Sequence, residues 1–218
     1  MSGYERAPLT PDAVGELFRC FPHSWWIAGG WAIDLFLGHT TREHGDIEVA
    51  LLRRDQQSLR RHLLGWELHY AADGGLHAWP EEEWLELPRH EIWARTHDDP
   101  RWRLELLLNE SSGGEWLFRR DPRLSRPLDE VGVTTAAGLS ILAPEIVLLY
   151  KARLPEPKDE ADLAAVLSAL DDGRRSWLAS ALGLVHPGHR WVDLLNASRS
   201  AGAADAGTRA RRSGSGGG

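Results

Sequence analysis

The sequence predicts an α/β (α+β) protein with a separate helical part toward its C-terminal end. Three observations support this class. Up to Leu108, helical spacing of apolar residues alternates with short strand-like stretches. From Leu142 onward, only helical patterns follow. A chain of 218 residues with 42% hydrophobic content can also bury a core. We therefore expect a first domain over residues 1–135 and a helical subdomain over 136–198. Residues 199–218, rich in Gly, Ala, Ser and Arg, are expected to be disordered.

The first quarter of the chain predicts alternating helices and strands. Thr10 is a suitable N-cap ahead of Pro11, and Gly38 is a suitable C-terminal stop for a second helix. The pair Gly29-Gly30 between them indicates a turn. The expected elements are, in order, a helix over Pro11–Phe21, a strand over Trp25–Ala28, a helix over Trp31–Leu37, a polar loop over Thr40–Gly45, a strand over Asp46–Leu52 and a helix between Asp55 and Gly65.

The remainder of the chain predicts first strands and then helices. Apolar and alternating stretches bounded by turn residues are typical of short strands, and Pro144 occupies a position that suits the first turn of a helix. The expected strands cover Trp66–Tyr70, Leu76–Trp79, Glu91–Arg95 and Trp102–Leu108, and the expected helices cover Glu145–Arg153, Lys158–Leu170, Arg174–Leu182 and Trp191–Asn196.

Charge and cysteine content exclude several classes of protein. A formal net charge of -7 argues against a general nucleic-acid binder, which would carry a basic surface. Cys20 is the only cysteine, so the chain has neither a disulfide framework nor a cysteine-based zinc site. The segment Met1–Asp12 has no apolar signal region, and no stretch is long enough to span a membrane. We expect a cytoplasmic protein.

Three acidic residues in apolar surroundings predict a metal site. Asp46 and Glu48 stand at i and i+2 of one expected strand, so both side chains project from the same face. Glu105 is a lone acid inside another apolar strand, where it needs a partner. Three such carboxylates would suit Mg²⁺, which leaves coordination positions for substrate phosphates. The alternatives are a solvated strand edge for Asp46 and Glu48 and a pairing of Glu105 with Arg103.

Several further residues suit contact with phosphate. Gly29 and Gly30 would let backbone approach a phosphate without a Cβ in the way. A hydroxyl, a guanidinium and an imidazole follow at Thr41, Arg42 and His44. Lys151, in a mostly apolar helix, is a further phosphate candidate, with an exposed lysine as the alternative. The chain contains neither GxGxxG nor GxxxxGK[ST], so neither a dinucleotide fold nor a P-loop is indicated.

The chain has 11 Trp residues, an unusually high number. Most are expected to pack in the core or at its rim, because Trp buries a large apolar area. The alternative is that some of Trp79, Trp84 and Trp93 form platforms for a sugar ring, a base or a cationic ligand.

Two sequence blocks resemble a known family. The segment Ala28–Asp34 (AGGWAID), followed by Thr41–Glu48 (TREHGDIE), is similar to the GGWAID and TRxHxDI[DE] blocks of the nucleotidyltransferase superfamily, within it the aminoglycoside 2''-adenylyltransferase-like and lincosamide nucleotidyltransferase-like proteins. The resemblance extends in outline over residues 12–195 and is strongest over 27–49. Many relatives have Asp where this chain has Glu48, although Asp-x-Glu also occurs in the superfamily.

The resemblance implies a mixed sheet flanked by helices, followed by a helical subdomain, and a Mg²⁺-dependent enzyme that uses ATP. Asp46 and Glu48 would ligate the metal, and Glu105 would be a third ligand or the general base for an acceptor hydroxyl. Gly29 and Gly30, with Arg42 and Lys151, would cradle the phosphates. Attack on the α-phosphorus would transfer AMP and release pyrophosphate.

The acceptor implied by the resemblance is a small molecule such as an aminoglycoside or lincosamide antibiotic, which would make the chain an antibiotic-resistance enzyme. An acidic rim would suit a polycationic acceptor, with an ordinary solvated loop as the alternative. Transfer to a protein or to RNA, as in toxin–antitoxin nucleotidyltransferases, and nucleotide binding without turnover are the competing hypotheses. The residues of the expected rim are Asp73, Glu81, Glu82, Glu83, Glu86, Asp98 and Asp99.

Overall fold

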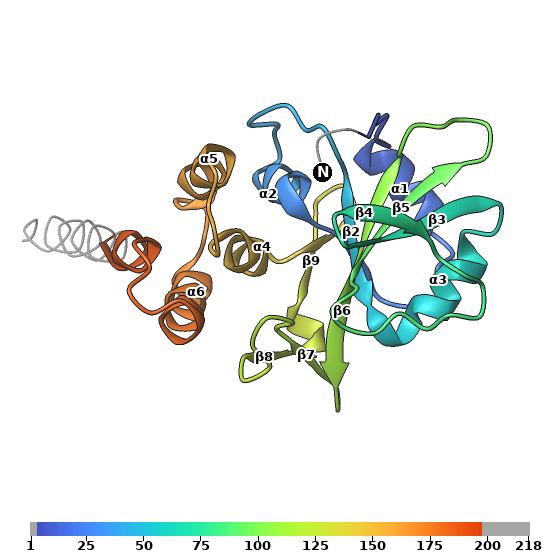
Figure 1. Ribbon diagram of the computed structural model, residues 1–218. Helices are drawn as coiled ribbons and strands as arrows, with labels where there is room; N and C mark the ends of the chain where they lie inside the picture. Colours follow the sequence, from blue (N-terminus) through green and yellow to red (C-terminus); the bar gives the residue numbers. More distant parts are fainter. Residues whose placement is uncertain (1–3, 198–218) are drawn as a thin grey trace, which may run out of the picture. The chain divides into compact units, whose positions relative to one another are not determined.

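The computed structural model describes residues 4–197 and divides into two compact units, Met1–Ala143 and Pro144–Gly218 (Figure 1). The division comes after Ala143, later than the predicted boundary at residue 135, because the strand Ser140–Leu142 still pairs with the sheet of the first unit. The predicted disordered tail, residues 199–218, lies outside the described residues. Within residues 4–197, no helix combines the length and the apolar character needed to cross a membrane.

The first unit is built on a mixed ten-stranded sheet, as the sequence predicts for its class. Its main path runs β4-β3-β5-β6-β2-β1-β10-β9, while β7 pairs with β6 and β8 with β7. The pairs β2–β6 and β1–β10 are parallel, and the other pairs are antiparallel. The strands are β1 (Trp25–Ile27), β2 (Glu48–Leu52), β3 (Trp66–Ala72), β4 (Gly75–Ala78), β5 (Glu91–Thr96), β6 (Leu104–Ser112), β7 (Glu115–Leu117), β8 (Ser125–Pro127), β9 (Gly132–Thr134) and β10 (Ser140–Leu142).

Helices α1 (Pro11–Phe18), α2 (Gly29–Leu37) and α3 (Gln56–His62) belong to the first unit. The cap predictions are confirmed: Thr10 Oγ1 accepts a hydrogen bond from the Ala13 amide, and Gly38 ends α2 in the left-handed conformation, with φ 77°. The prediction of a turn at Gly29-Gly30 is wrong, because both glycines form the first turn of α2. Short 3₁₀ turns, η1 (Arg53–Asp55) and η2 (Leu128–Glu130), complete the unit.

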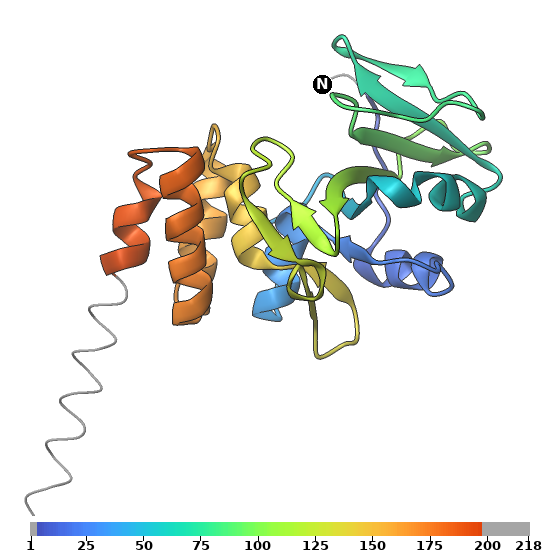
Figure 2. The ribbon, with the colours of Figure 1, turned by 90° about the horizontal axis from the view of Figure 1, so that it is seen from below.

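One face of the sheet is covered by α1 and α3. Leu108 of β6 lies opposite Leu51 of β2, which lies opposite Trp25 of β1. The Trp25 ring contacts Phe18 of α1, with 5.1 Å between centroids, and Phe18 contacts His62 of α3 at 5.4 Å. Figures 1 and 2 show α3 running along this side of the strands. Side chains alternate across a strand, so Glu105, three residues before Leu108, lies on the opposite face.

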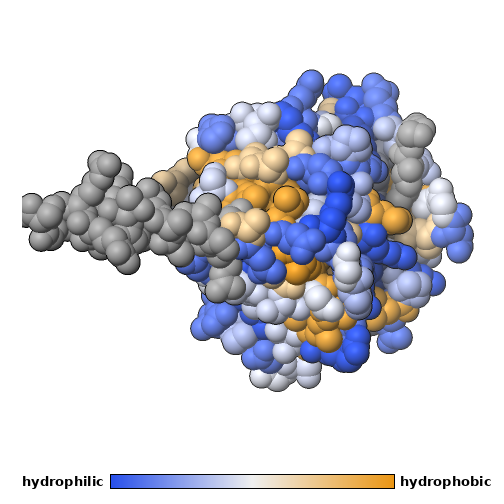
Figure 3. All heavy atoms as spheres, turned by 90° about the vertical axis from the view of Figure 1, so that its left-hand side faces the viewer, coloured by the Kyte–Doolittle hydropathy of each residue, from blue (hydrophilic) through white to orange (hydrophobic). Residues whose placement is uncertain are grey.

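The second unit contains α4 (Pro144–Lys151), α5 (Pro157–Val166) and α6 (Asp172–Val185), and residues 191–197 are also helical. All residues of α4 from Pro144 to Leu149 are buried. The fully buried carboxylate of Glu145 accepts two hydrogen bonds from Arg174 Nη1, both 2.8 Å long. The exposed leucines of this unit are single side chains, and Figure 3 shows apolar areas interspersed with hydrophilic ones on the face it views. These exposed leucines are Leu154, Leu184 and Leu194.

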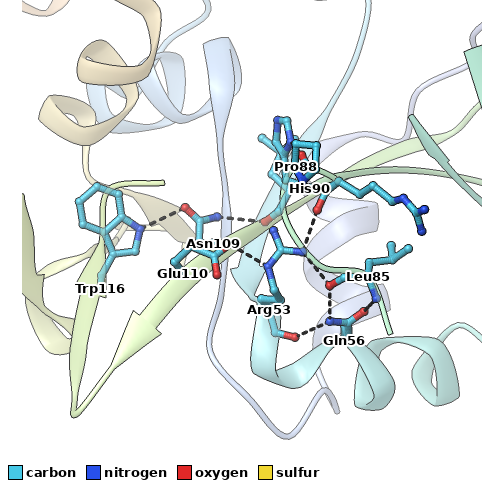
Figure 4. A network of polar contacts seen from close by, with 10 residues as sticks. Arg53, Gln56, Leu85, Pro88, His90, Asn109, Glu110 and Trp116 are labelled. Carbon is cyan, nitrogen blue, oxygen red and sulfur yellow. Dashed lines mark hydrogen bonds and ion pairs between the residues drawn. The ribbon is translucent and has the colours of Figure 1, made fainter. Parts of the chain in front are cut away.

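A polar network fixes the segment between β4 and β5 (Figure 4). Arg53, which is buried, donates through Nε to Glu110 Oε1 (2.7 Å) and through Nη1 to the carbonyls of Leu85 (2.9 Å) and Arg89 (2.7 Å). Gln56 bonds the Leu85 backbone in both directions, donating to its carbonyl and accepting from its amide. The segment is therefore fastened to the start of α3.

His90, at the end of this segment, gives the fold a pH dependence. The pKa of His90 is lowered to about 4, mainly by burial and also by the positive charges of Arg119 and Arg53, while the hydrogen bond to the Pro88 carbonyl opposes the shift. A folded-state pKa below the ordinary value of 6.5 means that the neutral ring stabilises the fold above that value. This stability is lost as pH falls from 6.5 toward 4, by at most about 1.4 kcal/mol per pH unit.

Denaturant unfolding of His90→Asn and wild type between pH 7 and pH 4 tests this expectation. Asn keeps a donor near the position of Nδ1 and does not titrate, so the variant should lose less stability on acidification than wild type. His39→Asn, at an exposed position, serves as the control. Equal pH slopes for wild type and His90→Asn would show that His90 is not the group responsible.

Candidate active site

The acidic residues singled out in the sequence lie at one end of two neighbouring strands. Glu48 of β2 and Glu105 of β6 are direct neighbours in the parallel register, so both side chains project from the face opposite α1 and α3. Asp46 comes before β2 begins, although the sequence predicts it inside the strand. Its side chain is 45% exposed, whereas that of Glu105 is 12% exposed.

A guanidinium lies between two of these carboxylates. Arg6 Nη1 donates to Asp46 Oδ2 at 2.6 Å, and Arg6 Nη2 lies 3.0 Å from Glu105 Oε1. The second approach is an ion-pair contact without hydrogen-bond alignment, so Glu105 Oε1 is buried without a hydrogen-bond partner. The Arg6 guanidinium also stacks on the ring of Trp93, 4.3 Å from its centroid. Trp93 lies opposite Glu105 in the pairing of β5 with β6.

The surroundings of Glu105 favour its protonated form. Burial raises the pKa of Glu105 to about 8, and the charges of Glu48, Glu91 and Asp46 raise it as well, while the Arg6 guanidinium opposes them. A carboxyl group with such a pKa is mostly protonated at neutral pH and, once deprotonated, takes up a proton readily, which suits acid–base chemistry. The alternative, a pairing of Glu105 with Arg103, is not what the structure shows, since Arg103 Nη1 lies 3.7 Å from Asp99 Oδ2 instead.

The first turn of α2 lies against this cluster. Gly29 has φ 61°, and a Cβ at this residue would lie 1.6 Å from Glu48 Oε2. A Cβ at Gly30 would lie 2.2 Å from Arg42 Nη2 and 2.7 Å from His44 Nδ1. The N-cap residue Ala28 has no side chain to cap the helix. Backbone N–H groups at such a helix start are suited to bind phosphate.

Gly29→Ala is therefore expected to lower activity by displacing the Glu48 carboxylate, by about 10²-fold for a shift near 1 Å. Gly38→Ala is the matched control, because Gly38 also has a positive φ, 77°, but has no atom within 4 Å of an added Cβ. Turnover and thermal unfolding should be measured for both variants. A similar loss of stability in both, with loss of turnover only in Gly29→Ala, would support the assignment. Full activity of Gly29→Ala would contradict it.

Thr41 and His44 are bonded to a buried acid. Thr41 Oγ1 donates to Asp34 Oδ1 at 2.5 Å, and His44 Nε2 lies 2.6 Å from Asp34 Oδ2. The His44 ring also packs on Trp31, with centroids 4.5 Å apart. Both residues thus fasten the loop before Asp46 to α2. Sequence analysis missed Asp34 as part of the site, although an acid within the apolar run of α2 signalled that a partner was needed.

Lys151 is bonded within the second unit. Its Nζ lies 2.6 Å from Asp159 Oδ1 and 3.0 Å from Asp162 Oδ2, and both aspartates are buried. Burial by itself would lower the pKa of Lys151, but the hydrogen bond to Asp159 and the charge of Asp162 outweigh it and raise the pKa. These contacts account for Lys151 without a phosphate.

The residues of the expected acidic rim lie in three segments of the chain, and Asp73 is in the turn between β3 and β4. Arg60 of α3 donates to the carbonyls of Trp79 and Pro80, which holds the start of the segment with Glu81, Glu82, Glu83 and Glu86 on the helix-covered side of the sheet. Asp98 and Asp99 follow β5, and Asp99 forms an ion pair with Arg101.

Two of the expected aromatic platforms already have partners. Arg60 stacks on Trp79 at 4.1 Å, and Arg6 stacks on Trp93. Both rings are buried, as the packing interpretation predicts, whereas Trp84 is 45% exposed.

The chemistry of the three carboxylates suits a divalent cation. Asp46, Glu48 and Glu105 offer hard oxygen ligands, and Glu105 Oε1 is buried without a hydrogen-bond partner. In the part of the chain that the structure describes, no three Asp, Glu, His or Cys side chains stand close enough together to hold a metal ion. The residue types therefore fit Mg²⁺, while their present arrangement is closed around Arg6. Nothing in the sequence pattern indicated Arg6.

Solved structures of other proteins share the fold of this chain. The crystal structure of the lincosamide antibiotic adenylyltransferase LnuA with lincomycin bound matches with a TM-score of 0.52 and 16% identity, over 75% of this chain and 100% of that one. The crystal structure of ANT(2'')-Ia in complex with adenylyl-2''-tobramycin matches with a TM-score of 0.50 and 19% identity, over 78% of this chain and 92% of that one. The fold is that of the nucleotidyltransferases, as predicted.

A family model narrows this class. Residues 12–71 match the family described as aminoglycoside-2''-adenylyltransferase, and this segment contains α2, Asp46 and Glu48. The predicted resemblance is thereby confirmed over this segment. A comparison with curated proteins found no match.

Proposed function

We propose that this protein transfers AMP from ATP, with Mg²⁺, to a hydroxyl group of an aminoglycoside or lincosamide antibiotic and releases pyrophosphate. The observation that carries the proposal is the pairing of Glu48 with Glu105 beside Asp46, directly against the glycine start of α2. The matched segment and the antibiotics named for the two similar structures support the choice of acceptor.

Each part of the cluster has a role in this proposal. Asp46 and Glu48, with Glu105 as a third ligand or as the base, would hold Mg²⁺. When bound, the metal would supply charge stabilisation for the attacking and leaving oxygens. The backbone N–H groups at Gly29 and Gly30 and the Arg42 guanidinium would bind the triphosphate and orient it for in-line attack.

Glu105 is the candidate for proton transfer from the acceptor hydroxyl. It is the less exposed of the two acids that Arg6 contacts, and its raised pKa suits proton acceptance near neutral pH. Asp34, with Thr41 and His44, would keep the loop that carries Asp46 in place. The ion pairs of Lys151 with Asp159 and Asp162 already account for the position of its side chain. A role of Lys151 in nucleotide binding therefore requires that Lys151 variants change the affinity for ATP.

Incubation with α-labelled ATP, Mg²⁺ and a panel of aminoglycosides and lincosamides tests the proposal. A product heavier than its acceptor by one AMP, together with pyrophosphate, would establish the reaction and the acceptor. Glu105→Gln should lower the rate of transfer much more than the affinity for ATP, because an amide cannot accept the proton. If ATP binds but no antibiotic in the panel is modified, the proposed acceptor class is wrong.

A further inference from the structure

The N-terminal segment brings Arg6 to the carboxylates along a defined path. The Ala7 amide donates to the Trp102 carbonyl, the Trp102 amide donates to the Glu5 carbonyl, both at 2.9 Å, and the Leu9 amide donates to the Arg103 carbonyl at 3.0 Å. These bonds make a short parallel pairing beside the start of β6. Arg6 is thus held by its backbone, and its side chain reaches Asp46 and Glu105.

The guanidinium fills the space between the acids. The pocket formed by Arg6, Asp46, Trp93, Trp102 and Glu105 has a free volume of about 10 Å³, which is room for about one water molecule. The Arg6 contacts with Asp46 and Glu105 use ligand atoms that a metal ion would need. A metal ion at this position and the present Arg6 contacts therefore exclude each other.

We propose that Arg6 is the resident counter-ion of this cluster and competes with the divalent cation for Asp46 and Glu105. The inference rests on the proposed function, because it takes these carboxylates as the metal site. In the free protein Arg6 lies against the carboxyl groups of Asp46 and Glu105 and offsets negative charge there. When the cation binds, the guanidinium leaves the two carboxylates and keeps its contact with the face of Trp93.

The chemistry of arginine fits this role. Its guanidinium stays charged at any working pH, so deprotonation does not relieve the competition. It is also planar and weakly hydrated, which lets it lie on an indole ring while its edge faces a carboxylate. Arg95 provides an internal comparison, because it stacks on Trp102 at 4.6 Å and pairs with Glu67 at 2.7 Å, away from the three carboxylates.

Binding of Mn²⁺ to the full chain, without nucleotide and followed by electron paramagnetic resonance, tests the proposal. Arg6→Met keeps a stem that packs on Trp93 and removes the charge, and it should bind Mn²⁺ about tenfold more tightly than wild type. Arg6→Lys should be intermediate, since ammonium cannot bridge two carboxylates in a fixed plane. Arg95→Met, the matched control, should bind as wild type does.

Thermal unfolding with and without Mn²⁺ provides a second readout, and it also shows whether each Arg6 variant is folded. Arg6→Met should unfold at a lower temperature than wild type without metal, because Asp46 and Glu105 lose the cation that contacts both. Saturating Mn²⁺ should stabilise this variant more than wild type. Arg6→Lys, which retains a charge, should show the same direction with a smaller size. Equal or weaker Mn²⁺ binding by the folded Arg6 variants overturns the inference.

Mn²⁺ binding by Glu48→Gln distinguishes failure of the Arg6 inference from failure of the proposed function. Glu48 belongs to the proposed metal site, whereas the Arg6 contacts invoked here are those with Asp46 and Glu105, so Glu48→Gln should weaken Mn²⁺ binding in wild type and in Arg6→Met alike. If Glu48→Gln leaves Mn²⁺ binding unchanged, the metal does not bind at these carboxylates and the proposed function itself is wrong. If Glu48→Gln weakens binding while Arg6→Met does not strengthen it, only the role of Arg6 is wrong.

Discussion

Asp46→Asn is expected to lower the rate of AMP transfer by at least about 10²- to 10³-fold while the protein remains folded. The change removes one negative charge and one oxygen ligand from the proposed metal site. The Asp46 side chain is 45% exposed and its pair with Arg6 is partly solvated, so the free energy of unfolding should change by less than about 1 kcal/mol. Single-turnover transfer from labelled ATP and denaturant unfolding measure the two quantities.

Asp73→Asn is a suitable control for this variant. Asp73 is an exposed turn residue with φ 50°, a conformation that Asn accepts as readily as Asp. The control makes the same chemical change away from the carboxylate cluster and should transfer AMP at the wild-type rate. Transfer by Asp46→Asn at the wild-type rate would show that the active site has been assigned wrongly.

Lys151→Met is expected to destabilise the protein by about 3–5 kcal/mol, because it leaves two buried carboxylates without their cation. Asp159 and Asp162 are 6% and 1% exposed, and both lie within 3.0 Å of Lys151 Nζ. Urea unfolding measures the loss. Lys158→Met is the matched control, because Lys158 is 56% exposed and contacts only the exposed Glu156 among the ion pairs described.

The triple variant Lys151→Met, Asp159→Asn, Asp162→Asn should regain part of the lost stability, since it removes the unpaired charges together with the lysine. If Lys151→Met is instead as stable as wild type and binds ATP more weakly, the interpretation of Lys151 as a phosphate-binding residue would be restored.

The helix and strand pattern of the first hundred residues could be predicted because their signals are local. Thr10 ahead of Pro11 and Gly38 after α2 act through bonds to residues nearby in the chain. The strands β7 to β10 were not predicted, since each spans three residues and gains its partners from distant segments. The prediction of a turn at Gly29-Gly30 is wrong for a related reason. A glycine pair indicates a turn locally, whereas the close approach of Glu48 to Gly29 depends on tertiary packing.

For the candidate site, the sequence alone singled out acids by their periodicity and by their apolar surroundings. The spacing of Asp46 and Glu48 predicts a shared face, and an isolated Glu105 predicts a partner. It also connected these residues, through the AGGWAID and TREHGDIE blocks, with the nucleotidyltransferases. These inferences need only the spacing and identity of residues that are close together in the chain.

The tertiary structure decided which groups face these acids. The register of β2 with β6 makes Glu48 and Glu105 neighbours, and the pairing of residues 5–9 with Trp102 and Arg103 brings in Arg6. Strand register and the docking of a terminal segment depend on contacts between residues far apart in the chain, which no local pattern encodes. The sequence therefore determined which acids are candidates for the site, and the fold determined which charged groups lie beside them.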